Sequence, residues 1–206
     1  MPKEKAIIFR KLSRSHLEAI GRVAASWSLI EMNMIMGLSQ LTDIRLRTIL
    51  TLVAPSNPKS WGEMLVALSE ATAAKKHIQQ EMVAICDLLS KLYTRRNFIV
   101  HAVWQTPNEH RKNFKVLTAF SKAHATGIPK SGGKGFVDVQ WSPKQMRDVA
   151  NAIEEARIML IEICDRQLPT SQRMHDASIY RGQTNLRRIQ EMLDRLPDPF
   201  QMSQLT

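Results

Sequence analysis

Apolar residues recur at alternating steps of three and four along two long stretches of the sequence, at about 13–41 and about 73–103. This spacing gathers the apolar side chains on one face of an α-helix, and that face has to be covered by other helices. The same pattern returns in further segments, at about 42–53, 60–71, 142–165 and 184–196. The sequence therefore predicts a mainly α fold, an antiparallel bundle of four to five helices.

The pattern changes after the second long helix. Two later segments, 114–120 and 136–141, are rich in β-branched and aromatic residues and are bounded by turn residues, which is typical of strands. We expect them to form a small β-hairpin insertion, at about 114–141, before the last core helix. Two capping boxes predict helix starts, one at 60–63 and one at 142–145, where proline also occupies the first helical position.

A chain of 206 residues is long enough for one well-buried domain and short for two. We expect this domain at 13–166, with an N-terminal arm at 1–12 and a C-terminal extension with a short helix at 167–206. The sequence has no apolar run that would cross a membrane and no signal peptide. Its two cysteines, Cys86 and Cys164, lie in apolar runs and form neither a disulfide framework nor a zinc spacing. These features predict a cytoplasmic protein with no membrane partner, metal or cofactor.

The net charge of +10 is unevenly distributed along the sequence. The window 91–134 holds nine Lys and Arg and one acid, Glu109, and thus supplies +8 of the total. Such a concentration favours a polyanion as partner, although a solubilising basic face explains the charge equally well. In this window Trp104 could stack on a base or fill space in the core as an ordinary buried aromatic side chain. The candidate nucleic-acid-binding residues are Lys91, Trp104, Arg111, Lys112, Lys115, Lys122, Lys130 and Lys134.

Polar residues interrupt the apolar face at the end of the second long helix. Arg96 occupies the apolar register, while Tyr93, Asn97 and His101 form a neighbouring row at i, i+4 and i+8. Burying a charge is costly unless a partner compensates it. Glu31, which interrupts the apolar face of the first long helix, is the candidate to pair with Arg96 or to orient it. We count Glu31, Tyr93 and Arg95 as supporting residues.

The pattern Arg96-Asn97-x-x-x-His101 resembles the Arg-polar-x(3)-His signature of the HEPN superfamily, the helical "higher eukaryotes and prokaryotes nucleotide-binding" domains. The resemblance covers about residues 13–166. It implies a metal-independent endoribonuclease in which Arg96 and His101 are the principal catalytic pair and Asn97 supports them. It also implies a homodimer, with the two motifs facing each other across a shared cleft, and a role as a toxin or defence protein under an antitoxin or regulatory partner. Toxins of this family often carry a Tyr two residues after the His, whereas this chain has Val103.

The residue types suit this chemistry. RNA carries its own nucleophile, the 2′-hydroxyl, so cleavage requires a base to take its proton and a cation to stabilise the phosphorane. A histidine titrates near neutral pH, and an arginine presents a planar fork that matches phosphate oxygens. On a continuous helix, however, Arg96 and His101 are about 140° apart and Asn97 and His101 about 40° apart. The larger offset favours a site built from two chains.

Two other functions are compatible with the same residues. The chain could be a non-catalytic module of HEPN type that binds RNA or a nucleotide. It could also be a purely structural helical interaction protein, with Arg96 neutralised by Glu31 and His101 bonded to a backbone carbonyl.

Overall fold

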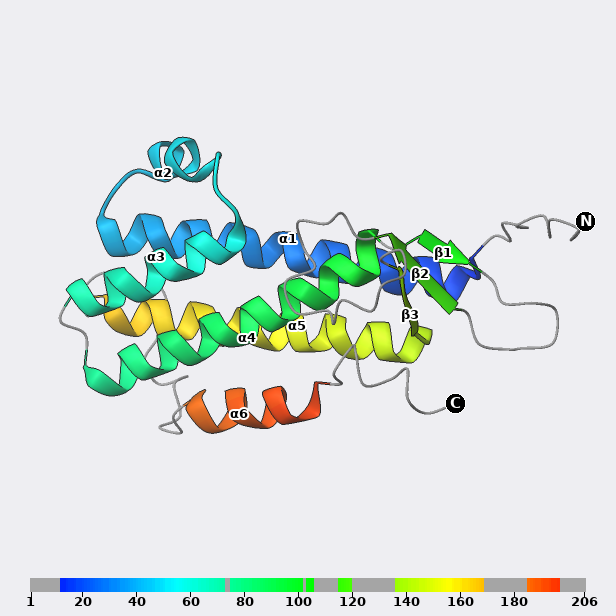
Figure 1. Cartoon of the computed structure of the whole chain (residues 1–206). Helices are drawn as coiled ribbons and strands as arrows, with labels where there is room; N and C mark the ends of the chain where they lie inside the picture. Colours follow the sequence, from blue (N-terminus) through cyan, green and yellow to red (C-terminus); the bar gives the residue numbers. More distant parts are fainter. Residues whose placement is uncertain are drawn as a thin grey trace, which may run out of the picture.

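The computed structural model describes residues 12–72, 75–101, 103–105, 115–119, 136–168 and 185–196, and this part of the chain is mainly helical. Figure 1 shows four long or medium helices side by side, with a short helix on either flank and three short strands at one end. The helices are α1 (Arg14–Thr42), α2 (Leu46–Val53), α3 (Pro58–Ala71), α4 (Lys76–His101), α5 (Pro143–Gln167) and α6 (Asn185–Arg195). The strands are β1 (Val103–Gln105), β2 (Lys115–Ala119) and β3 (Phe136–Gln140).

The sequence signals for the helices are largely confirmed. At the start of α5 the hydroxyl of Ser142 accepts from the backbone N–H of Gln145, and the Gln145 side chain accepts from the backbone N–H of Ser142. The capping box predicted at 60–63 is wrong. Helix α3 begins earlier, at Pro58, because the side chain of Asn57 caps it by accepting from the backbone N–H groups of Lys59 and Ser60. An asparagine followed by proline is itself a strong helix start.

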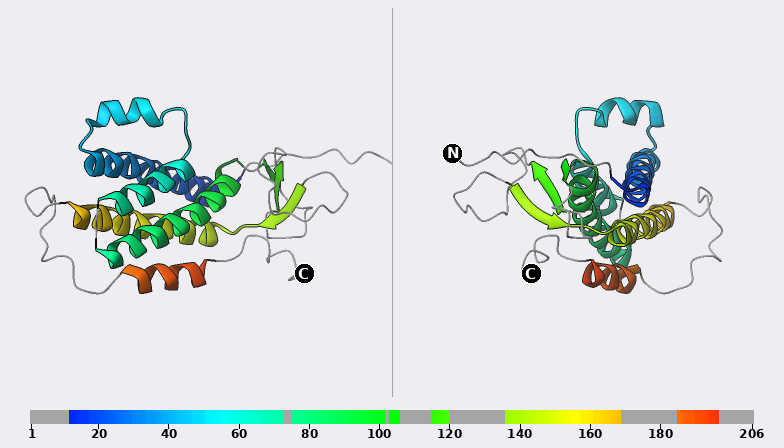
Figure 2. Two further views of the ribbon diagram at one scale, coloured as in Figure 1. Left: turned by 60° about the vertical axis from the view of Figure 1, so that its left-hand side comes forward. Right: turned by 90° about the vertical axis from the view of Figure 1, so that its right-hand side faces the viewer.

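Helix α4 runs in the opposite direction to α1, α3 and α5 (Figure 1). Helices α1 and α5 are therefore parallel neighbours, which two contacts confirm. Arg22, early in α1, donates to Asn151, early in α5, at 2.8 Å. Gly37, late in α1, faces Cys164, late in α5, so closely that a Cβ built at Gly37 would lie 2.9 Å from the cysteine sulfur. As a result, the N-termini of α1 and α5 lie at the same end of the molecule as the C-terminus of α4 (Figures 1 and 2).

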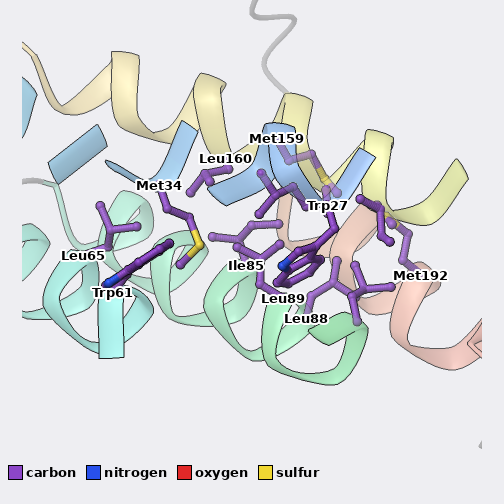
Figure 3. Packing of buried hydrophobic residues seen from close by; sticks show 14 of the residues in the cluster. Trp27, Met34, Trp61, Leu65, Ile85, Leu88, Leu89, Met159, Leu160 and Met192 are labelled. Carbon is purple, nitrogen blue, oxygen red and sulfur yellow. The ribbon is translucent and has the colours of Figure 1, made fainter. Parts of the chain in front are cut away.

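A single apolar core lies between these helices, and Figure 3 shows side chains from α1, α3, α4, α5 and α6 converging on it. Complete burial of one large apolar side chain stabilises the fold by about 1.5–3 kcal/mol relative to leaving it exposed. The largest side chains with almost no exposure are Trp27, Trp141, Ile30, Met34, Leu65, Met82, Ile85, Leu88, Leu92, Ile99, Met146 and Ile153. This core fixes α4 on its neighbours and so fixes the polar residues at the end of α4.

A buried ion pair adds a polar tie between α4 and α5. The side chain of Glu81 is 0% exposed and is bonded to the guanidinium of Arg166, which is 19% exposed. Both residues lie in the half of the molecule away from the end of α4. The pattern of apolar residues had not singled out either of them.

The backbone of the three strands forms an antiparallel sheet in the order β1-β2-β3. Val116 of β2 lies opposite Trp104 of β1 on one side and Val139 of β3 on the other. Strands β2 and β3 lie within the segment expected to form the hairpin, 114–141, and β1 directly follows α4. Within the described residues, no helix is long and apolar enough to span a membrane.

Candidate functional site

The last two turns of α4 bring Arg96, Asn97 and His101 together. One nitrogen of the Arg96 guanidinium, Nη1, donates to Oδ1 of Asn97 at 2.9 Å. The same nitrogen lies 2.7 Å from Nε2 of His101. Arg96 and Asn97 are half-buried, whereas His101 is exposed. The three side chains therefore form one hydrogen-bonded cluster with the imidazole on its outer side.

The donor inventory of this cluster fixes the state of the histidine. Nη1 of an arginine carries two hydrogens and no lone pair for accepting, so it can serve Asn97 and His101 at once. The contact with His101 therefore requires Nε2 to be the acceptor. The imidazole is then neutral, with its proton on Nδ1. A histidine in this form presents on Nε2 the lone pair that a general base needs.

The offset of about 140° between Arg96 and His101 does not keep them apart. Helix α4 is continuous through His101, and the long arginine side chain reaches round it to Nε2. The offset therefore gives no geometric reason for a second chain. One chain assembles the arginine, the amide and the imidazole by itself.

The arginine in the apolar register is Arg95 rather than Arg96, which corrects the assignment made from the sequence. Arg95 is 7% exposed, and its guanidinium donates to the backbone carbonyls of Lys91, at 3.1 Å, and Leu196, at 3.4 Å. Leu196 directly follows α6, so that helix covers the side of α4 on which Arg95 lies. Arg95 is a packing residue that ties the two helices together, and Arg96 is left at the edge of the core.

Glu31 does not pair with Arg96. Its carboxylate accepts from the indole Nε1 of Trp27 at 2.8 Å, and the Trp27 ring lies 5.5 Å from the ring of Tyr93. Glu31 and Tyr93 thus belong to one aromatic contact between α1 and α4. Among the described residues Arg96 has no acidic partner, and its buried Nε has no hydrogen-bond partner. A cation left without a counter-ion beside an exposed imidazole is suited to an anionic ligand.

The nucleic-acid-binding residues predicted from the sequence are only partly described. Lys91 is exposed on α4. Trp104 lies in β1 and Lys115 in β2, where the structure describes the backbone alone. The remaining five fall outside the described residues, and these are Arg111, Lys112, Lys122, Lys130 and Lys134.

The first turns of α1 and α5 add positive charge to this end of the molecule. The N-terminus of each helix carries a partial positive charge from its unpaired N–H groups. Arg14 begins α1, and Lys144 and Arg147 lie on the first turns of α5. Two acids, Glu18 and Asp148, offset part of this charge. The partial negative charge at the C-terminus of α4 offsets one of the two helix N-termini. With Arg96 included, the side chains at this end of the bundle are cationic on balance.

Sequence reasoning missed another polar residue at this end, His16. It is 4% exposed, and its Nδ1 lies 2.7 Å from the hydroxyl of Ser13. Burial lowers the pKa of its imidazole, and a backbone hydrogen bond with Trp141 opposes that shift. His16 therefore joins the start of α1 to the start of α5. The sequence carries no direct signal for its burial, because apolar periodicity favours the neighbouring Leu17 as the core residue, and Leu17 is exposed.

Comparisons with protein-family models, with curated proteins and with solved structures find no match for this chain. Within the described residues, no three His, Cys, Asp or Glu side chains are grouped so that they could hold a metal ion.

Proposed function

We propose that the chain is a metal-independent endoribonuclease of HEPN type, with Arg96, Asn97 and His101 as its catalytic residues. The observation that carries the proposal is the cluster itself. An exposed neutral imidazole is bonded through Nε2 to an arginine that has no acidic partner among the described residues. The purely structural alternative requires Glu31 to neutralise Arg96, and Glu31 is bonded to Trp27.

The proposed reaction begins when a scissile phosphate meets the guanidinium of Arg96. A phosphate oxygen is a stronger acceptor for arginine than a neutral imidazole, because the bond is assisted by opposite charges. The Nη1–H group that donates to His101 then donates to the phosphate oxygen instead. This exchange frees the Nε2 lone pair beside the reacting nucleotide.

His101 then takes the proton of the 2′-hydroxyl, and the 2′-oxygen attacks the adjacent phosphorus. Arg96 stabilises the negative charge on the phosphorane oxygens, and the amide of Asn97 holds the guanidinium in place. The bond to the 5′-oxygen breaks, leaving a 2′,3′-cyclic phosphate and, after protonation, a 5′-hydroxyl. An imidazolium supplies that proton, either from His101 or from the same residue of a second chain.

The remaining parts of this proposal concern the fold and the partners. We propose that α1, α3, α4 and α5 form the bundle proper and that the 114–141 segment is a hairpin inserted into it. The cationic end of the bundle and the basic window 91–134 support RNA as the partner. A homodimer controlled by an antitoxin or regulatory partner follows from the resemblance alone, whereas a cytoplasmic location follows from the sequence features given above.

The test is incubation of the purified chain with a single-stranded RNA and with the DNA of the same sequence, both in excess chelator. We expect cleavage of the RNA only, with 2′,3′-cyclic phosphate ends. His101→Ala and Arg96→Ala should each lower the rate by about 100-fold or more. Lys76→Ala, an exposed basic residue at the opposite end of the same helix, is the matched control and should leave the rate unchanged.

Two outcomes would overturn the nuclease. One is RNA that stays intact at high protein concentration, and the other is activity that survives His101→Ala. If the intact RNA is nevertheless bound with a strong dependence on salt, the chain is the non-catalytic binding module. A circular dichroism spectrum of each variant separates loss of chemistry from loss of fold.

A further inference from the structure

A cavity of about 360 Å³ lies between α1, α3 and α4, and none of the three motif residues lines it. Its volume falls within the range of about 300–1,000 Å³ that is usual for small-molecule sites. At the cavity wall, α3 and α4 approach each other closely at Gly62 and Cys86. The Cys86 thiol of α4 donates to the carbonyl of Gly62 of α3 at 3.5 Å.

The inner walls of the cavity are apolar. Trp27 and Met34 of α1 line it together with Leu89 of α4, which lies beside Trp27 in Figure 3. Val83, at the rim, is 42% exposed. Burial raises the pKa of the Cys86 thiol to about 12, so this lining residue carries no charge at neutral pH. The interior therefore favours an apolar or aromatic group.

The rim of the cavity is acidic, which is unusual in a chain with a net charge of +10. Glu63 of α3 and Asp87 of α4 line it, with one basic residue, Lys59. Both carboxylates are exposed and have no ion-pair partner among the described residues. The ring of Tyr93 also lines the cavity, and an aromatic face attracts a cation. The rim therefore favours a ligand whose charged end is positive.

We propose that this cavity binds a small organic amine, with its aromatic or alkyl body against Trp27 and Met34 and its ammonium group at Glu63 and Asp87. The site is separate from the Arg96 cluster. Tyr93 nevertheless belongs both to the cavity wall and to the α4 row that contains Asn97 and His101. A ligand in the cavity would therefore contact Tyr93, which lies one helical turn before Asn97 and two turns before His101.

The experiment compares three probes of one shape, namely 4-phenylbutylamine, 4-phenylbutanol and 4-phenylbutanoate. Binding to the full chain is measured by isothermal titration and by the fluorescence of tryptophan. We expect the amine to bind at least about tenfold more tightly than the alcohol, as a charge-assisted contact implies. The carboxylate should bind more weakly still.

Two variants and one control locate the site. Asp87→Asn combined with Glu63→Gln should weaken the amine to the level of the alcohol without changing the affinity for the alcohol. Glu70→Gln, an exposed acid on α3 outside the cavity, should leave all three affinities unchanged. His101→Ala should also leave them unchanged, so this test stands whether or not the chain cuts RNA.

Equal affinities for the three probes would overturn the proposal, because the acidic rim would then be irrelevant. Absence of binding by all three would also overturn it. An affinity for the amine that survives the double acid variant would place the amine elsewhere on the chain.

Discussion

Replacing Arg166 by methionine is expected to lower the free energy of unfolding by about 3–5 kcal/mol. The reason is the position of its partner, since the Glu81 side chain is 0% exposed. Without Arg166 a carboxylate is left in the core with no cation, and water cannot reach it to replace the lost bond. The cost is that of an uncompensated buried charge, which exceeds the net contribution of the ion pair itself.

Replacing Glu81 instead of Arg166 should lower the free energy of unfolding by less. Arg166 is 19% exposed, so its guanidinium can turn toward water when the carboxylate is removed. In Glu81→Gln the amide oxygen still accepts from Arg166. We therefore expect a loss of about 1–3 kcal/mol, that of a weakened buried hydrogen bond. The unequal cost of the two single variants follows from the unequal exposure of the two side chains.

Urea unfolding followed by circular dichroism measures both variants. With a urea dependence of about 1–3 kcal/mol per M, Arg166→Met should move the midpoint down by roughly 1–5 M. The control is Arg157→Met on the same helix, because Arg157 pairs with Glu154 at 2.9 Å while the two side chains are 28% and 32% exposed. A surface pair of this kind contributes about 0–1 kcal/mol.

Two results would refute the reasoning. The first is an equal loss of stability in Arg166→Met and Arg157→Met. The second comes from the double variant Glu81→Leu with Arg166→Met, which removes both charges and should be more stable than Arg166→Met alone. If the double variant is less stable, an isolated buried carboxylate is not the source of the loss.

Two further predictions concern packing and pH. Gly37→Ala should destabilise the chain by about 1–2 kcal/mol, because the new Cβ would lie 2.9 Å from the sulfur of Cys164 and the cost of overpacking exceeds the roughly 1 kcal/mol gained in helix propensity. Adding Cys164→Ala should restore stability. A thermal melt in which it does not would contradict the steric argument. Burial holds the pKa of His16 below its usual 6.5, so the unfolded chain takes up this proton first. The stability that neutral His16 contributes is complete above about pH 6.5 and declines as the pH falls from there toward its folded-state pKa. His16→Gln should flatten Tm against pH in this window, whereas exposed His77→Gln should not; equal slopes would exclude His16 as the cause.

Much of the fold could be predicted because helix periodicity is a local property of the sequence. The long helices α1, α4 and α5 agree with the predicted ranges to within a few residues, and the capping box at Ser142 is present. The mainly α class followed from these segments. The predicted start of α3 was wrong because the sequence offers two possible N-caps, Asn57 and Ser60, and the structure uses Asn57, the residue before proline.

The sequence also determined which residues share the end of α4, because Arg96, Asn97 and His101 lie within two turns of one helix. It could not determine how they meet. The arginine side chain is long enough to reach round the helix, so the angle between two Cα positions did not limit the contact at 2.7 Å. The side-chain conformations within α4, and not a tertiary contact, decided that one chain can assemble the cluster.

Tertiary structure chose the partners of Arg95 and Glu81, which lie far away in the sequence. Arg95 is buried because Leu196, 101 positions away in sequence, accepts from it, and Arg96 consequently lies at the core edge. Glu81 is likewise paired with Arg166 across 85 positions. Glu31, by contrast, is bonded to Trp27 one turn away in the same helix and not to Arg96. Periodicity fixes the face of a helix on which a residue lies, within about a third of a turn. The neighbour that covers that face depends on how helices distant in sequence pack together.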